Sequence, residues 1–266
     1  MTEGTSRQGE VTAKFNRSQR RVGHVPFWIK FAQGFSALPG QHKEWAFNTL
    51  LLLYYSQLLG MSATLAAGVI AISLVFDAIS DPVAGAFSDS FRSRWLGRRH
   101  PLMLASIIPS CVAIFALFSP PQDLEEYVLA AWMLACTVTL RVSFSFFAVP
   151  WGAIAAEFSE DYAERTIIIA FRMMIGVLGG GLFGFLALRI LFQDSGGGLF
   201  NPSHYHPFAA TISGLMFFWM TFSTLATLNQ VKYLPQPSGV VPKVAPWEML
   251  MRIAEALKKN DTRARC

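Results

Sequence analysis

The chain has 266 residues, of which 53% are hydrophobic and only 15% are charged, and its mean hydropathy is +0.38. A soluble domain carries about 25% charged residues, so this chain has too few of them to cover the surface of a soluble protein. Its net charge of +5 comes from short basic clusters between apolar runs, which argues against nucleic acid as a partner. The length allows about six membrane spans, because each needs roughly 20 residues.

Residues 1–25 are polar and basic without an apolar core, so they are expected to form a cytoplasmic tail rather than a cleaved signal peptide. Residues 26–231 are expected to form a transmembrane domain, and the Leu38-Pro39-Gly40 run interrupts its first apolar stretch. Six spans are expected, at residues 26–60, 62–87, 102–119, 127–151, 166–191 and 207–231. The sequence therefore predicts an all-α integral membrane fold of six transmembrane helices.

Lysine and arginine residues gather in alternate loops, which indicates the orientation of the spans. They are frequent in the first 25 residues, after the second span and after residue 231, and they are absent from the loops near residues 60, 123 and 200. Both termini are therefore expected in the cytoplasm, with the protein in the cell (inner) membrane. The loop near Glu157 is acidic and also faces the cytoplasm, because acidic residues contribute little to this rule.

Residues 232–266 are expected to form a cytoplasmic connector that is truncated at Cys266. After Pro246, apolar residues recur on one helical face, which is typical of an amphipathic helix at the inner membrane surface. These residues are Trp247, Leu250, Met251, Ala254 and Leu257.

Asp77 and Asp81 are the strongest local indication of function. They are four residues apart, so both side chains lie on one face of the second span. A carboxylate at membrane depth costs roughly 2.5 kcal/mol or more and usually faces a cavity or a partner. Pro82 cannot donate a backbone hydrogen bond, so the carbonyl of Ala78 is left free beside the carboxylates. These oxygens favour a site for Na⁺ or a proton over the alternative, a structural ion pair with an arginine of a later span.

A second group of residues surrounds the loop after the second span. Gly85, Asp89, Gly97, Arg98 and Arg99 resemble the Gly-x-x-x-Asp…Gly-Arg-Arg loop of the major facilitator superfamily. Asp89 is placed to pair with the two arginines, and such a conformational lock favours one state of an alternating transporter. The alternative for the arginines is simple anchoring at the lipid head groups.

The run Phe76-Asp77-Ala78-Ile79-Ser80-Asp81-Pro82, followed by Arg92-Ser93-Arg94-Trp95, strongly resembles the glycoside–pentoside–hexuronide:cation symporter family, the melibiose permease-like proteins. The resemblance covers roughly residues 27–261 and implies one half of a major facilitator superfamily fold. It implies that Asp77 and Asp81 bind the coupling cation, and that Arg172 lines the substrate cavity. It continues at Val149-Pro150-Trp151, at Asp161-Tyr162-Ala163-Glu164-Arg165-Thr166 and at Phe171-Arg172.

The chain departs from the sugar-transporting relatives at two positions. Ala148 and Gln41 stand where those relatives carry aspartates that are associated with sugar hydroxyls. These differences argue against a galactoside substrate and leave both Na⁺ and H⁺ open as the coupling ion. Relatives also include animal sodium-dependent lysophospholipid carriers, so a lipid or lysolipid carrier is an alternative function.

Arg141 carries a guanidinium group into the fourth span, and two roles are open for it. It either binds an anionic substrate or neutralises Asp77 or Asp81. Trp151, near the end of the same span, is expected to form the cavity wall or part of the core.

Gly176, Gly180 and Gly184 recur every four residues in the fifth span, where close helix packing is expected. In the first span, a proton relay through His42 and Glu44 is one interpretation. Pairing with Lys43 or with solvent is the preferred one.

The sequence contains no phosphate-binding loop, dinucleotide fingerprint or nucleophile elbow, so an enzyme is not expected, and neither is a cofactor beyond the coupling cation, Na⁺ or H⁺. The expected function is cation-coupled symport of a small organic solute such as a sugar or sugar acid. Membrane lipid and a second half, or a second copy, are the expected partners. The alternative is an inactive or accessory half-transporter that needs a partner half. Substrate-binding residues are expected to be Arg172, Gln41, Arg141 and Trp151.

Overall fold

The computed structural model describes residues 15–16, 25–90, 96–158, 161–193, 196–230 and 236–237. Most of the predicted tail and connector, including the amphipathic segment at 247–257, lies outside the described residues. The described part is a bundle of helices with a two-residue antiparallel strand pair, β1 (Phe15–Asn16) and β2 (Gln236–Pro237). The long helices are α3 (Ala63–Ser90), α4 (His100–Leu117), α5 (Glu126–Glu157), α6 (Tyr162–Leu186) and α7 (Tyr205–Leu228). Short 3-10 helices at Gly198–Phe200 and Pro202–His204 precede α7.

The first span is built from several short helices rather than one long one. It comprises α1 (Phe27–Phe35), α2 (Leu38–Ala46) and two π-helical segments, η1 (Phe47–Leu51) and η2 (Tyr54–Leu58). The break between α1 and α2 lies just before Pro39, which occupies the first turn of α2, where the missing backbone N–H of a proline costs no helical hydrogen bond. This confirms the predicted interruption. The other five spans are each long and apolar enough to cross a membrane as continuous helices.

The ends of the fourth and fifth spans differ from the prediction. A charged loop was expected at Glu157 and Glu164, but α5 continues to Glu157 and α6 already begins at Tyr162. Asp161 caps α6 by accepting a hydrogen bond from the backbone N–H of Ala163 at 3.1 Å, which satisfies one of the free donors of the first turn. Both glutamates are therefore held on helices, in fixed positions. A final π-helical turn, η3 (Ala187–Leu191), extends α6.

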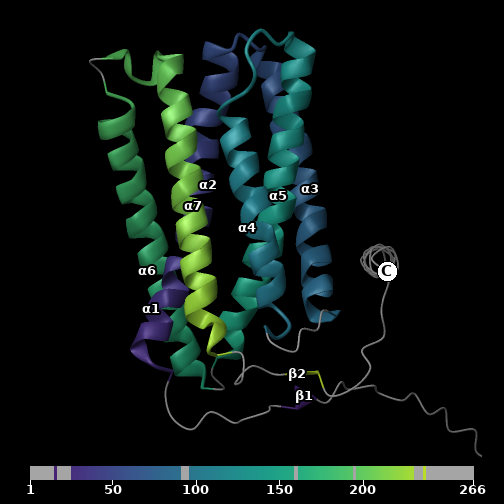
Figure 1. Ribbon diagram of the computed structural model, residues 1–266, viewed down its shortest axis with the longest axis vertical. Helices are drawn as coiled ribbons and strands as arrows, with labels where there is room; N and C mark the ends of the chain where they lie inside the picture. The colour runs from purple at the N-terminus through teal and green to yellow at the C-terminus, as the bar shows by residue number, and fades with distance from the viewer. Residues whose placement is uncertain are drawn as a thin grey trace, which may run out of the picture.

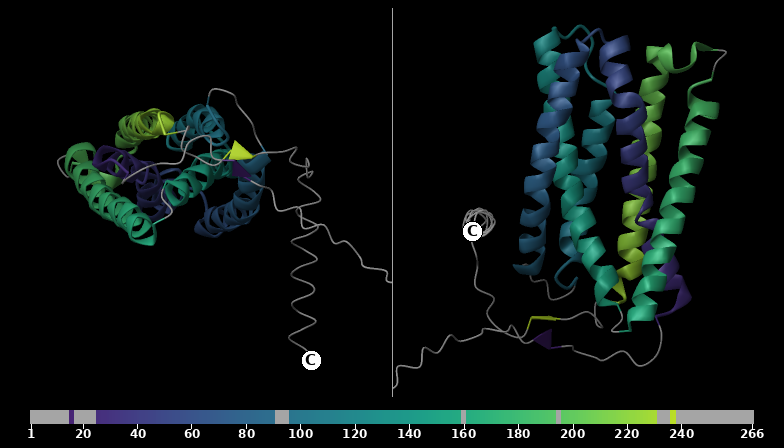
Figure 2. Two further views of the ribbon diagram at one scale, coloured as in Figure 1. Left: turned by 90° about the horizontal axis from the view of Figure 1, so that it is seen from below. Right: turned by 180° about the vertical axis from the view of Figure 1, so that it is seen from behind.

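The helices form one bundle with α4 and α7 packed together on one face and α3 and α6 at its two ends (Figures 1 and 2). Helix α5 packs against both α3 and α4, and the first span packs against α6 and α7. Aromatic rings pack together at the end of the core near Gly60, where the Tyr54 and Tyr205 rings stack with their centroids 4.1 Å apart. The Tyr55 hydroxyl donates to the carbonyl oxygen of Leu117 at 2.8 Å. Of the five long spans, α3 and α6 bury the smallest share of their residues.

The glycine series of α6 lies against the first span. A Cβ atom at Gly176 would be 3.2 Å from the Cβ of Ala37, and one at Gly180 would be 2.9 Å from the Cβ of Gln41. Gly184 faces the indole of Trp45. The absence of side chains lets the two helices approach closely, which confirms the predicted packing role.

Glu164 connects the start of α6 to the start of the first span. Its carboxylate is 4% exposed, accepts a hydrogen bond from the backbone N–H of Val25 at 2.6 Å and pairs with Lys30 Nζ at 3.0 Å. Glu164→Gln is expected to lower the free energy of unfolding by about 3 kcal/mol, because it leaves the largely buried Lys30 ammonium uncompensated. Denaturant titration in detergent micelles would measure this change, and an unchanged midpoint would show that the pair does not stabilise the fold.

Candidate ion and substrate site

Asp77 on α3 is bound to Arg141 on α5, about midway along both helices. Arg141 Nη1 donates to Asp77 Oδ2 at 2.9 Å, and Arg141 Nε donates to the hydroxyl of Ser73 at 3.0 Å. The guanidinium carbon also lies 5.2 Å from the centroid of the Phe47 ring, so the first span contributes a cation–π contact. Arg141 is only 6% exposed. Of the two roles left open by the sequence, neutralisation of Asp77 is the one that the structure contains.

Asp81 lies one turn further along α3 and has a different environment. Its side chain is exposed, and within the described part of the chain it has no ion pair. Pro82 follows it inside the continuous helix, so the carbonyl of Ala78 lacks its usual donor and points toward this turn. The helix is held here by a hydrogen bond of 2.9 Å between the hydroxyls of Ser80 and Ser145. Asp81 is thus an open carboxylate on a turn of α3 that is attached to α5 through Ser80.

Trp151 and Arg172 form a second polar group, between α5 and α6. The Arg172 guanidinium carbon lies 4.3 Å from the centroid of the Trp151 ring. Trp151 is itself fixed by two hydrogen bonds with Gln33 of α1: its indole N–H donates to the Gln33 carbonyl at 3.3 Å, and its carbonyl accepts from Gln33 Nε2 at 3.1 Å. Gln33 is 1% exposed and was not singled out in the sequence. The ring therefore presents a rigid face to a half-buried guanidinium.

The structure does not bring all of the predicted site residues into contact. Arg141 and Trp151 are ten residues apart on α5, or about 15 Å along the helix axis. Gln41 is exposed on α2 and lies beside Gly176 and Gly180 of α6. The polar residues therefore form an aspartate–arginine group around α3 and a tryptophan–arginine group nearer the Glu157 end of α5, with Gln41 on the first span.

The cluster of ion pairs that was predicted to act as a conformational lock is centred on Glu157 rather than on Asp89. Arg98 Nη2 and Arg99 Nη2 both donate to Glu157 Oε1, at 2.8 and 2.5 Å, and Arg99 Nε donates to Glu157 Oε2 at 3.2 Å. Asp89 is more distant, at 3.7 Å from Arg98 and 3.5 Å from Arg99, and is 62% exposed. Glu157 was missed because it was placed in a loop. The sequence did contain an indication of this role, because Glu157 is an acidic residue just beyond an apolar run, on a membrane face that is otherwise basic.

The charged residues of α2 form a local pair. Lys43 Nζ is 3.0 Å from Glu44 Oε1 and 4.7 Å from the centroid of the Phe144 ring on α5. The His42 ring stacks on Phe183 at 4.2 Å between centroids. The preferred interpretation, pairing of Glu44 with Lys43, is confirmed.

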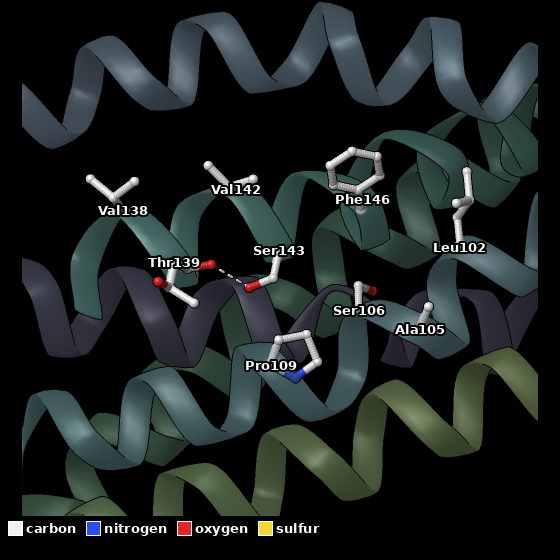
Figure 3. Close-up of a pocket in the computed structure, with 9 residues that line it drawn as sticks. All are labelled: Leu102, Ala105, Ser106, Pro109, Val138, Thr139, Val142, Ser143 and Phe146. Carbon is white, nitrogen blue, oxygen red and sulfur yellow. Dashed lines mark hydrogen bonds between the residues drawn. The ribbon is translucent and has the colours of Figure 1, made fainter. Parts of the chain in front are cut away.

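Two cavities among the described residues are separate from these polar groups. One of about 470 Å³ lies between α4 and α5 (Figure 3), where the hydroxyls of Ser106 and Ser143 bond to carbonyl oxygens of their own helices. The other, of about 670 Å³, lies between the first span, α6 and α7, and its lining is largely apolar. Neither is lined by Asp77, Asp81 or an arginine. The two polar groups on α3, α5 and α6 are therefore not part of either of these cavities.

Comparison with known proteins assigns the family. Residues 32–258 match the model of the MFS/sugar transport protein family. The chain is 34% identical over 146 residues to an uncharacterized symporter of Synechocystis sp., an alignment covering 53% of this chain and 26% of the relative.

Two further relatives align over more of the chain. The isoprimeverose transporter of Lactiplantibacillus pentosus is 22% identical over 89% of this chain and 47% of its own length. The glucuronide carrier protein homolog of Escherichia coli is 24% identical over 71% of this chain and 41% of its own length. The chain thus aligns with less than half of each of these relatives. Its six spans are one half of a major facilitator superfamily fold, and the chain belongs to the glycoside–pentoside–hexuronide:cation symporter family of multi-pass membrane proteins.

Proposed function

We propose that the chain forms one half of a secondary transporter that couples movement of a small organic solute, such as a sugar or sugar acid, to Na⁺ or H⁺. The observation that carries this proposal is the pair of carboxylates on α3, one bound to a buried arginine and the other open. Ionisable groups within a membrane span are costly and are retained at ion or substrate pathways. In this proposal Asp77 and Asp81 belong to the cation site.

The proposal includes a second six-helix unit, because transporters of this type enclose their site between two halves. Helices α3 and α6 lie at the two ends of the bundle (Figure 2). Both expose many large apolar side chains. A second half, or a second copy of this chain, would cover these surfaces. In this proposal the end of the bundle that carries Arg98 and Arg99 faces the cytoplasm, and both termini with it, because basic residues are enriched on the cytoplasmic side. The same cluster, with Glu157 and Asp89, would stabilise one state of the transport cycle.

We assign the solute to the group around Trp151 and Arg172. A fixed aromatic ring beside a guanidinium suits a solute with an apolar face and a hydroxyl or carboxylate. Gln41, on the first span, would complete the wall of this solute site. Two relatives, an isoprimeverose transporter and a glucuronide carrier homolog, support a sugar or a sugar acid as the solute.

The test of the proposed function is uptake into membrane vesicles that contain the chain together with its partner half or second copy. Uptake is expected to follow an imposed Na⁺ or H⁺ gradient, and Asp81→Asn is expected to abolish this dependence because the open carboxylate is lost. Asp123→Asn is the matched control, since Asp123 lies in a loop with φ 58°, a conformation that asparagine tolerates. Gradient-dependent uptake by the Asp81→Asn variant would refute the ion site.

Competition experiments separate the candidate solutes. Sugars, hexuronates and lysolipids are each added in excess to the same vesicles, and inhibition by lysolipids alone would identify a lipid carrier. The further alternative, an accessory half-transporter, rests on the alignment with less than half of each relative. Crosslinking in the native membrane would then trap a partner, while no gradient-dependent uptake of any solute would be found.

A further inference from the structure

We propose that Arg141 is a resident cation that permanently occupies Asp77, so that the coupling ion exchanges at Asp81 rather than at both aspartates. This inference rests on the proposed function, because it assigns the ion of that transport cycle to one carboxylate. It differs from the expectation that Asp77 and Asp81 act as equivalent ligands.

Arg141 is held in place by three different contacts. Its Nη1 atom bonds to Asp77 at 2.9 Å, its Nε atom bonds to Ser73 at 3.0 Å, and its guanidinium lies over the Phe47 ring. These partners come from two separate spans, α3 and the first span, while Arg141 itself belongs to α5. If Asp77 turned away to coordinate the coupling ion, the Arg141 guanidinium would lose its counter-charge although Arg141 is only 6% exposed. Uncompensated buried charge is strongly unfavourable.

The charges of the group match a single monovalent ion. Two carboxylates and one guanidinium leave one net negative charge, and the nearby Lys43–Glu44 pair is neutral by itself. One Na⁺ or one proton at Asp81 therefore neutralises the group, whereas a divalent ion would leave an excess positive charge in the membrane. Arg141 thus acts as a specificity-determining residue, because it lowers the charge that the ion meets.

Asp81 has the features needed of the exchanging carboxylate. It is exposed and unpaired among the described residues, whereas Asp77 is one-third exposed and paired. The carbonyl of Ala78, freed by Pro82, supplies a second hard oxygen on the same turn. Oxygen ligands of this kind suit Na⁺ as well as a proton.

The decisive variant removes both members of the pair at once. Asp77→Asn alone is expected to unfold readily, because Arg141 remains buried without a partner. The double variant Asp77→Asn with Arg141→Gln replaces the ion pair by two neutral amides, which can bond to each other without a buried charge, and is expected to restore the thermal unfolding temperature. This variant isolates the role of Asp77 in ion binding from its role in stability.

The readout is the shift in unfolding temperature of the purified chain, reconstituted in lipid nanodiscs with its partner half or second copy. Na⁺ is titrated against choline at constant ionic strength, and a pH series serves as the probe for protons. In the double variant, the unfolding temperature is expected to change with Na⁺ or pH by the same amount as in the protein without substitutions. Asp81→Asn is expected to shift the ion midpoint by at least about tenfold or remove the response, as loss of metal-site groups does.

The outcomes distinguish this inference from the proposed function. If the unchanged protein responds to Na⁺ or H⁺ and the stable double variant does not, Asp77 is a direct ligand and the inference is wrong, while ion coupling stands. If the unchanged protein responds to neither probe, ion coupling fails and the inference fails with it. A response that is kept in the double variant and lost in Asp81→Asn supports both.

Discussion

Replacing Glu157 by glutamine is expected to lower the free energy of unfolding by about 3–5 kcal/mol, the usual cost of removing one partner from a buried ion pair. Arg98 and Arg99 are each 7% exposed, and Glu157 accepts hydrogen bonds from both. Glutamine keeps the size of the side chain but not its charge, so two buried guanidinium groups lose their main counter-charge. Chemical denaturation in mixed micelles would measure the change.

Asp89→Asn is the matched control for this variant. Asp89 is 62% exposed and lies 3.5 Å or more from the same two arginines, so its pairing is screened by solvent. A loss of less than about 1 kcal/mol is expected, as for exposed ion pairs in general. Equal losses for the two variants would show that Asp89, as the sequence motif implies, is the true centre of the cluster.

Replacing Gly180 by valine is expected to destabilise the packing of α6 on the first span by about 1–3 kcal/mol, the range for an overpacked interface. A Cβ atom at this position would lie 2.9 Å from the Cβ of Gln41, and a Cβ atom cannot turn away as the end of a flexible side chain can. The two helices must therefore move apart. Thermal unfolding of the purified protein in detergent would report the loss.

Gly181→Val is the control in the same helix. No heavy atom lies within 4 Å of a Cβ built at Gly181, so the added side chain meets open space. Little loss of stability is expected there. A similar loss for both variants would mean that valine weakens α6 itself. The close packing of Gly180 against Gln41 would then not be the reason for the loss.

The sequence was sufficient to predict the number of spans, the membrane environment and the family. Runs of apolar residues long enough to cross a bilayer are a local property, since a membrane helix satisfies all of its backbone hydrogen bonds within itself. Each run from 62 to 231 therefore became one long helix in the structure. The break at Pro39 and the packing of the Gly176 series were predicted for the same reason, because proline and glycine act on the backbone nearby.

The ends of α5 and α6 were not predictable in the same way. Glu157 and Glu164 looked like loop residues because they are charged and lie between two apolar runs. They lie on helices because partners distant in sequence hold them: Arg98 and Arg99 for Glu157, Lys30 for Glu164. Charge alone does not mark the end of a helix when a counter-charge from another span is at hand.

The partners of the ionisable groups were decided by tertiary structure. The sequence placed Asp77 and Asp81 on one face of a helix, which followed from their spacing alone. It did not distinguish between them, and it left two roles open for Arg141. Packing of α3 on α5 selects Asp77 as the partner of Arg141 and leaves Asp81 open. A carboxylate's neighbours across a helix interface depend on which faces meet, and that is a property of the assembled bundle rather than of any one span.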